Sequence, residues 1–146
     1  MNLRGNYPAK VDEKGRLKIP ALFLEGLKEY GNQFYITSTT GESARIYPMK
    51  VWMGIEDKLA GVSSQNRAKR KFLMRTSYYG QTVELDAQGR VLLPAVLRES
   101  AQTKGEVDVF GNLDYLEVMN HTRVLDELKN SPYTDEDYKA LEDLGI

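Results

Sequence analysis

Residues 11–21, VDEKGRLKIPA, recur 74 positions later as residues 85–95, LDAQGRVLLPA. Both stretches carry the element Asp-x-x-Gly-Arg-x-x-x-Pro-Ala in the same register. A match of this length at a fixed offset is the signature of an internal duplication. We therefore expect a fold built from two similar halves.

Each copy of the element predicts a β-hairpin. Alternating apolar residues lie on both sides of the glycine, which is typical of two paired strands. Gly15 and Gly89 supply the positive φ that a short hairpin loop needs before its second strand. The expected strands are residues 7–11 and 17–19 in the first copy, and 82–85 and 91–93 in the second.

A helix is expected after each hairpin. Pro20 and Pro94 suit the first helical turn, because proline lacks only an N–H that would have no partner there. The helices are predicted at residues 21–30 and 95–101, with Gly31 and Gly105 as their ends.

Two more strands and a closing helix follow in each half. The strands are predicted at 33–37, 44–47, 106–110 and 115–119, with turns at 40–42 and 111–112. Amphipathic helices then begin near Val51 and Val124. The predicted unit is β-β-α-β-β-α, twice, which makes the protein mainly β with short helices (α+β).

This pattern divides the chain into four segments. The expected divisions are a first repeat at 1–62, a basic helical linker at 63–78, a second repeat at 79–130 and an acidic C-terminal tail at 131–146. Helix-start signals at Thr134 predict a short capped helix or a mobile end in the tail. Halves of this size bury too little surface alone, so we expect one shared core.

Charge is distributed unevenly along the chain. The net charge is −1 over 146 residues, but the chain up to Arg75 has 14 basic and 7 acidic residues, and the remainder has 6 and 14. This asymmetry favours a polyanion as the partner of the basic part, or attraction between the two halves.

Several classes of function lack the residues they require. The chain has no cysteine and a single histidine, His121, to which no chemistry is assigned. It offers no Ser-His-Asp set, no metal ligands at suitable spacing and no phosphate-binding glycine loop before a helix, so an enzyme, a metal site or a cofactor is not expected. Without a membrane-length apolar run or an N-terminal leader, the protein is expected to be cytoplasmic, with no membrane partner and no small-molecule substrate.

The residues of the loops allow two interpretations each. Arg16 is either a DNA contact or the partner of Asp12 in a hairpin-stabilising ion pair. In the same way, Arg90 is either a DNA contact or the ion-pair partner of Asp86. The lysines around the first loop form either a phosphate-binding strip or a protected, solvated strand edge; they are Lys10, Lys14 and Lys18.

For two other groups of side chains, a structural role is expected rather than a contact with DNA. The basic cluster at residues 67–75 is expected to meet the acidic half or a neighbouring subunit rather than DNA. Trp52, Phe23, Phe72 and the tyrosines fall at amphipathic spacings and are predicted to be core or interface residues rather than base-stacking platforms.

The two copies, DEKGRLKIP and DAQGRVLLP, resemble the paired signatures of the MraZ family. The resemblance covers nearly the whole chain and includes Tyr47-Pro48, Trp52 and the segment RKFLMR at residues 70–75. MraZ proteins are similar to AbrB-type regulators, which carry one motif per chain and dimerise. The resemblance therefore implies a swapped-hairpin β-barrel in which one chain supplies both halves.

The resemblance also implies roles for single residues. Asp12, Lys14, Gly15 and Arg16 match the first family loop, whose arginine is the expected DNA contact, and Asp86, Gly89 and Arg90 match the second. The candidate DNA-binding set is Arg16, Lys14, Lys18, Lys10, Arg90 and Gln88. Gln88 stands in place of a lysine, Ala87 carries no charge, and Leu24 occupies the position that Arg98 has in the second copy. We therefore expect the first loop to be the stronger DNA contact.

The function implied is that of a nucleoid-associated transcription factor. Family resemblance implies binding of double-stranded DNA at short direct repeats upstream of the division and cell-wall gene cluster, including its own promoter. It also implies a homo-oligomeric ring, an octamer or a dodecamer, which raises avidity. There are two alternatives. One is an antitoxin-like module, which the acidic tail favours, and the other is a structural ring protein.

Overall fold

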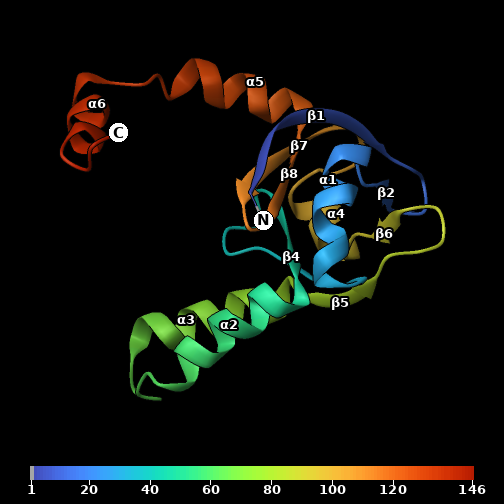
Figure 1. The fold of residues 1–146 in the computed structure, drawn as a ribbon, viewed down its shortest axis with the longest axis horizontal. Helices are drawn as coiled ribbons and strands as arrows, with labels where there is room; N and C mark the ends of the chain where they lie inside the picture. Colours follow the sequence, from blue (N-terminus) through green and yellow to red (C-terminus); the bar gives the residue numbers. More distant parts are fainter. Residues whose placement is uncertain (1) are drawn as a thin grey trace.

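The strands form one eight-stranded antiparallel sheet that curls into a nearly closed barrel (Figure 1). The computed structural model describes residues 2–146. Its strands are β1 (Leu3–Val11), β2 (Arg16–Lys18), β3 (Gln33–Thr37), β4 (Ala44–Pro48), β5 (Gln81–Glu84), β6 (Arg90–Leu92), β7 (Gly105–Leu113) and β8 (Leu116–Asn120). Their order is β5-β3-β4-β8-β7-β1-β2-β6. The ends of this order, β5 and β6, are consecutive strands, which brings the two edges of the sheet together.

Short helices complete each half of the barrel. They are α1 (Ala21–Leu27), continued by the 3-10 helix η1 (Lys28–Tyr30), then α2 (Met49–Ala60), α3 (Arg67–Tyr78), α4 (Ala95–Ser100), α5 (His121–Asn130) and α6 (Asp135–Glu142). The predicted β-β-α-β-β-α unit is present twice, and each copy is followed by one more helix. Helices α3 and α6 therefore hold the same place in the two repeats.

Strand pairing interlaces the two repeats. Four of the seven pairings join strands of different repeats: β1 with β7, β2 with β6, β3 with β5 and β4 with β8. The pairing of β1 with β7 is equivalent to that of β5 with β3. In both, the first strand of one repeat pairs with the third strand of the other. The predicted swapped-hairpin barrel, mainly β with short helices, is confirmed.

One core serves both repeats. Its fully buried side chains include Leu17, Ile36 and Ile46 from the first repeat, and Leu93 and Val109 from the second. Leu17 and Val91 lie opposite each other in the β2–β6 pair and both point inward. Neither repeat has a complete core of its own, as the size of the halves predicts.

Two predicted boundaries are wrong. Helix α4 ends at Ser100, and Gly105, with φ of 61°, opens β7 instead of ending the helix. The turn expected at residues 111–112 lies further on, because β7 continues to Leu113 along its partner β1. A Cβ at Gly111 would collide with the backbone of Arg4, so this glycine serves the close approach of two strands.

Helices α2 and α3 form a hairpin that projects from the barrel (Figure 1). Its anchor is Trp52, which is 4% exposed and stacks on Tyr35 at 4.7 Å and on Phe72 of α3 at 6.1 Å between ring centroids. The carbonyl of Thr76 accepts hydrogen bonds from Tyr35 Oη at 2.9 Å and Thr37 Oγ1 at 2.7 Å. Trp52 and Phe23 are buried as expected, and Phe72 is half-buried against Trp52, which fixes α3 to the barrel. Of the tyrosines expected in the core or an interface, Tyr78, Tyr133 and Tyr138 are exposed.

The second repeat lacks this anchor. Val124 is the one buried residue of α5, as Trp52 is of α2, but its side chain is shorter and has no aromatic ring to stack. Helix α6 has no buried residue and extends beyond α5, away from the barrel (Figure 1). A capping box between Thr134 and Asp137 starts α6, in agreement with the predicted capped helix.

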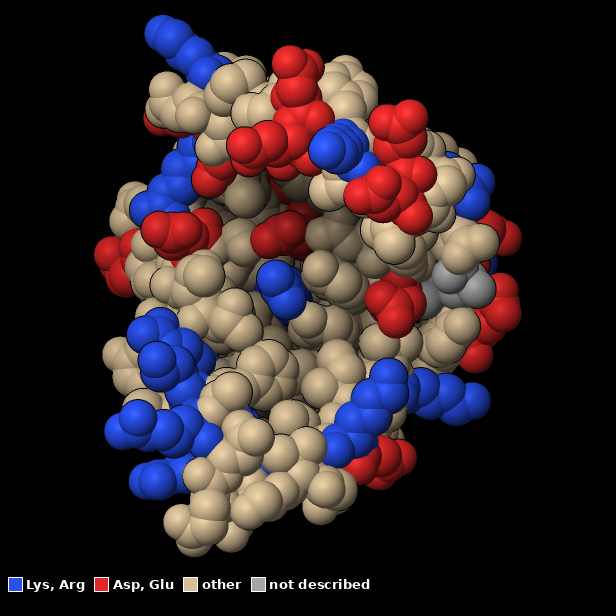
Figure 2. All heavy atoms as spheres, turned by 90° about the vertical axis from the view of Figure 1, so that its left-hand side faces the viewer, with Lys and Arg blue, Asp and Glu red and all other residues tan. Residues whose placement is uncertain are grey.

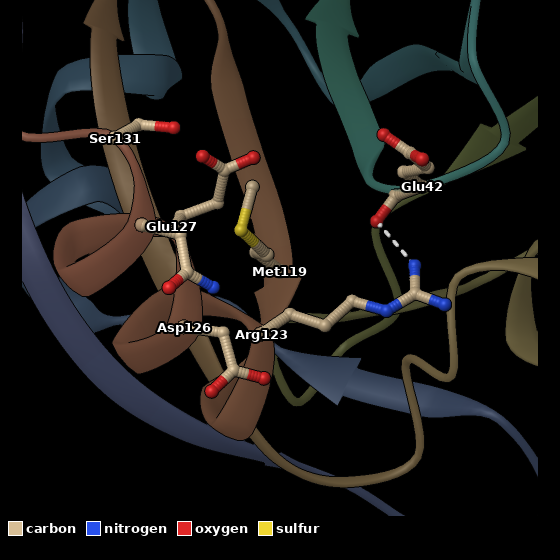
Figure 3. Close-up of a pocket in the computed structure, with 7 residues that line it drawn as sticks. Glu42, Met119, Arg123, Asp126, Glu127 and Ser131 are labelled. Atoms are coloured by element: carbon tan, nitrogen blue, oxygen red, sulfur yellow. Dashed lines mark hydrogen bonds between the residues drawn. The ribbon is translucent and has the colours of Figure 1, made fainter.

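Polar contacts hold the base of α5 against the barrel (Figure 3). The Arg123 guanidinium donates to the Glu42 carbonyl at 3.1 Å and the Ser100 carbonyl at 3.4 Å. Asn120 Nδ2 donates to the carbonyl of Gln102 at 2.9 Å. Helix α5 is therefore fixed at its base although α6 is free.

On the face of the molecule shown in Figure 2, the two kinds of charge are unevenly distributed. Acidic side chains predominate over its upper part, on the side of α5 and α6, and basic side chains predominate over its lower part, on the side of α2 and α3. None of the helices formed by residues 2–146 has the length and apolar character needed to cross a bilayer.

Candidate nucleic-acid interface

The first Asp-x-x-Gly-Arg loop is held by the side chain of its aspartate. Asp12 Oδ1 accepts hydrogen bonds from the backbone N–H of Lys14 at 3.0 Å and of Arg16 at 2.8 Å. Asp12 Oδ2 accepts from Arg16 Nε at 2.8 Å. Gly15, with φ of 85°, makes the turn. The aspartate thus sets both the shape of the loop and the direction of its arginine.

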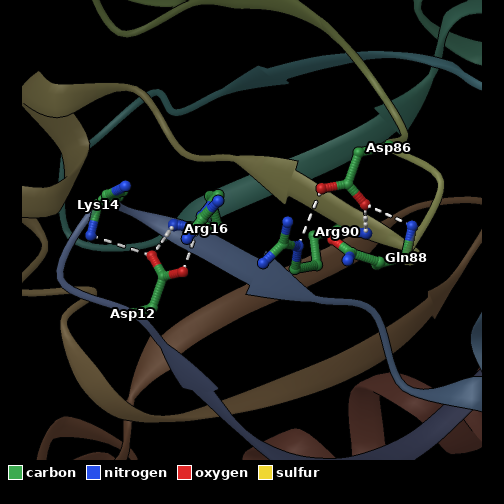
Figure 4. Close-up of polar contacts among 6 residues, drawn as sticks. All are labelled: Asp12, Lys14, Arg16, Asp86, Gln88 and Arg90. Carbon is green, nitrogen blue, oxygen red and sulfur yellow. Dashed lines mark hydrogen bonds and ion pairs between the residues drawn. The ribbon is translucent and has the colours of Figure 1, made fainter.

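The second loop repeats this arrangement (Figure 4). Asp86 Oδ1 accepts from the N–H of Gln88 and of Arg90, both at 2.9 Å, and Asp86 Oδ2 accepts from Arg90 Nε at 2.9 Å. Gly89 has φ of 75°. Despite different residues at the two x positions, the loops have the same hydrogen bonds.

Both aspartates are held in their charged form. The backbone N–H of Arg16 is the main cause that lowers the pKa of Asp12 below its usual value, and the Arg16 side chain adds to the effect. Arg90 lowers the pKa of Asp86 in the same two ways. Charge-assisted hydrogen bonds of this kind keep each loop in one geometry near neutral pH.

Pairing of β2 with β6 places the two loops next to each other. The N–H of Leu93 donates to the carbonyl of Gly15, and the N–H of Ile19 donates to the carbonyl of Gly89, both at 2.9 Å. Arg16 lies opposite Leu92, and Lys18 lies opposite Arg90. Because alternate residues of a strand share a face, all four side chains point away from the core.

Two of the three lysines in the strip expected around the first loop also have neighbours from the second repeat. Lys18 lies opposite Arg90 and so adds its charge beside the second loop's arginine. Lys10 lies opposite Glu106 of β7. Lys14 lies in the first loop itself. Strand exchange gives β1 and β2 each a neighbour from the other repeat.

A helix of the opposite repeat covers each loop. A Cβ at Gly15 would enter the space of the Arg98 guanidinium, whereas a Cβ at Gly89 would lie 3.2 Å from Leu24 Cδ2. Arg98 therefore lies over the first loop, and its counterpart Leu24 lies over the second. The first loop gains a cation from the second repeat, and the second loop gains an apolar neighbour.

Arg98 is a residue that the sequence did not identify as part of a site. Its Nε is buried and, within residues 2–146, has no hydrogen-bond partner. In the sequence, the one sign of a special role for Arg98 is that the aligned position of the first repeat holds Leu24. The alignment assigns Arg98 to the second loop, because both belong to the second repeat. Strand exchange between the repeats is what brings Arg98 to the first loop.

Arg16 and Arg90 each form the ion pair that stabilises the hairpin, and each is also exposed enough to contact DNA. The ion pairs with Asp12 and Asp86 involve Nε of Arg16 and Arg90, whose side chains are 35% and 27% exposed. A guanidinium has five N–H donors, so pairing through Nε leaves terminal donors for a second partner. The outer face of β2 and β6 can therefore donate hydrogen bonds to an anion or to base edges.

His121, to which the sequence assigned no chemistry, forms an ion pair at the start of α5. Its Nδ1 lies 2.6 Å from Oδ2 of the buried Asp108, which raises the pKa of His121 above its usual value. Asp108 Oδ1 also accepts from Asn6 Nδ2 at 3.2 Å. Residues 2–146 contain no cluster of three His, Cys, Asp or Glu side chains suited to a metal ion.

A family model described as "MraZ protein, putative antitoxin-like" matches residues 3–75 and 80–139 of the chain. The two matched segments correspond to the two interlaced repeats, and each segment ends within the last helix of its repeat.

Named relatives match over the full length. The chain is 55% identical over 144 residues to the transcriptional regulator MraZ of Acidobacterium capsulatum, covering 98% of this chain and 99% of the relative. It is 50% identical over 145 residues to that of Koribacter versatilis, with 98% and 99% coverage. It is 38% identical over 138 residues to that of Moorella thermoacetica, with 94% and 92% coverage. With two loops of one geometry and matches along the whole chain, the protein belongs to the MraZ family.

Proposed function

We propose that this protein, a transcriptional regulator, binds double-stranded DNA through the outer face of β2 and β6 and the two loops beside it. The observation that supports the proposal is the pair of Asp-x-x-Gly-Arg loops, held in one geometry and placed side by side. The major groove of B-DNA admits a two-stranded β-ribbon, and an arginine can bind the O6 and N7 atoms of guanine. Arg16 and Arg90 are the proposed base contacts.

The cations around the arginines are proposed to contact phosphates. Lys14 and Arg98 flank Arg16, and Lys18 flanks Arg90. Lys10 is the weaker candidate because Glu106 lies opposite it. Each neutralised phosphate releases counterions, so binding is expected to weaken steeply with salt. Gln88 offers an uncharged amide to the same surface.

The DNA target and the assembly complete the proposal. The protein binds short direct repeats upstream of the division and cell-wall gene cluster, including its own promoter, on the nucleoid in the cytoplasm. A homo-oligomeric ring, an octamer or a dodecamer, presents several identical loop pairs to repeated half-sites. Linking many weak contacts raises the overall affinity without new contacts, which suits a chain of net charge −1.

A gel-shift titration tests the loops. The DNA is the region upstream of the protein's own gene, and the titration is run at several salt concentrations. Arg16→Ala is expected to lower affinity by about 1–3 kcal/mol, the value of one bidentate base contact. Arg4→Ala, an exposed basic residue of β1 outside the loops, is the matched control. If Arg16→Ala keeps the affinity and salt slope of wild type, the proposed role of this loop is wrong.

A further inference from the structure

The last helices of the two repeats carry opposite charge. The basic hairpin, residues 49–78 with α2 and α3, has seven basic and two acidic residues. The acidic arm, residues 121–146 with α5 and α6, has three basic and seven acidic residues. Both project from the same face of the molecule, one from its lower and one from its upper part (Figures 1 and 2).

Neither set of charges is neutralised within one copy. None of the ion pairs formed among residues 2–146 includes a side chain of α3 or α6. On α3, Arg67, Arg70, Lys71 and Met74 line an open groove of about 620 Å³. Their spacing places them on one side of the helix. Helix α3 thus presents a cationic groove with an apolar residue at one end.

The acidic arm has a hollow of its own. At the base of α5, a recess of about 350 Å³ is lined by Glu42, Asp126 and Glu127, together with Arg123 (Figure 3). Apolar side chains on the arm are also exposed, with Leu128 at 71% and Tyr138 at 63%. On the basic hairpin, Met74 is 74% exposed. Each surface therefore combines charge of one sign with uncovered apolar side chains.

We propose that the acidic arm of one copy docks on the basic hairpin of a second copy. Opposite charges on the two surfaces identify the partner, because complementary potentials steer association and oppose other pairings. The exposed apolar side chains of both surfaces lose contact with water in this interface. Hydrogen bonds hold the base of α5 in a fixed position, and aromatic stacking does the same for α3.

When the arm and the hairpin of one copy bind two different neighbours, the contact is head to tail. Every added copy leaves one free arm and one free hairpin, and such a contact closes into a ring when its rotation allows. This inference rests on the oligomer of the proposed function and identifies the surfaces that build it. The duplicated last helix thereby has a role in assembly that differs between the repeats.

Two charge-reversed variants test the contact in the full chain without DNA. The hairpin variant is Arg67→Glu, Arg70→Glu and Lys71→Glu, and the arm variant is Asp126→Lys, Glu127→Lys and Glu142→Lys. None of these six side chains forms an ion pair or a cap among residues 2–146. Both variants are therefore expected to keep the circular dichroism and thermal unfolding of wild type.

Native mass spectrometry and analytical ultracentrifugation give the size of the assemblies. Wild type is expected to form oligomers at low salt, and each variant alone is expected to bind its own kind at least about tenfold more weakly, since like charges then face each other. An equal mixture of the variants is expected to assemble, because the reversed hairpin of one meets the reversed arm of the other. A chain with all six substitutions is expected to assemble for the same reason.

Other outcomes overturn the inference. A monomeric wild type, a hairpin variant that assembles as wild type does, or a mixture that stays dissociated each contradicts the contact. A hairpin variant that assembles normally but binds DNA more weakly identifies α3 as a nucleic-acid surface instead. Arg16→Ala is expected to assemble as wild type does, so failure of the DNA role and failure of this contact are separate results.

Discussion

Arg98 is the residue by which the two loops differ most. Its guanidinium lies over Gly15, while Leu24 occupies the equivalent place beside Gly89. Arg98→Leu is expected to weaken DNA binding for all sequences and to reduce the salt slope by about 1, as expected on loss of one phosphate contact. Gel shifts at several salt concentrations measure both quantities.

The reciprocal substitution is the control for Arg98. Leu24→Arg adds the same cation to the second loop and is expected to strengthen binding. The Nε of Arg98 is buried without a partner, so Arg98→Leu should not lower the melting temperature. If Arg98→Leu melts earlier than wild type and binds DNA unchanged, Arg98 serves the fold rather than the interface.

Gly15 and Gly89 have similar backbone angles but different neighbours. Both have positive φ, so alanine at either position is expected to destabilise the fold by about 1 kcal/mol or more. Gly15→Ala also displaces Arg98, whereas Gly89→Ala meets only the flexible end of Leu24. We expect Gly15→Ala to weaken DNA binding more than Gly89→Ala does at equal loss of stability. Urea unfolding and gel shifts of both variants make the comparison.

The ion pair of His121 with Asp108 predicts a dependence of stability on pH. Hydrogen bonding to Asp108 raises the pKa of His121 in the folded protein. The pair therefore stabilises the fold fully below about pH 6.5, the usual histidine pKa, and less as pH rises through the folded value.

Urea unfolding of wild type and His121→Gln tests this sign. The difference in unfolding free energy is expected to be larger at about pH 6 than at about pH 8.5, because only the protonated imidazole forms the ion pair. A difference that is the same at both pH values contradicts a charged His121.

At the scale of elements, Trp52 decides that α3 packs and α6 does not. It stacks on Phe72 of α3, while Val124 holds its place in α5 without an aromatic partner. Trp52→Ala is expected to cost about 3–5 kcal/mol and to speed hydrogen exchange of the α3 amides. Val124→Ala is the control and should leave exchange in α6 unchanged. Unchanged exchange in α3 of Trp52→Ala would show that Thr76 alone holds the helix.

At the scale of the whole molecule, the crossing of the repeats predicts how the chain behaves when cut. Four strand pairings and the core join the two halves, whereas the connection between α3 and β5 is short. Residues 1–78 and 79–146 expressed together are expected to purify as a 1:1 complex with the circular dichroism of the intact chain. Residues 79–146 alone are expected to lack a cooperative unfolding transition. Cooperative unfolding of that fragment would mean that each half has a core of its own.

Sequence alone determined the parts of this protein that depend on neighbouring residues. The duplicated element predicted two hairpins, because alternating apolar residues flank a glycine, the residue that takes positive φ at low cost. The capped helix at Thr134 and the helix after each proline follow from equally local rules. The barrel itself followed from the resemblance and from halves too small to fold alone.

Tertiary structure alone decided which repeat completes which loop. The sequence placed Lys18 with Arg16 and gave no site role to Arg98, but β2 pairs with β6 and α4 covers the first loop, so Lys18 faces Arg90 and Arg98 lies over Gly15. These contacts join residues more than 70 positions apart, and no local propensity encodes them. They arise because each repeat can bury its apolar face only against the other, which brings their side chains into one surface.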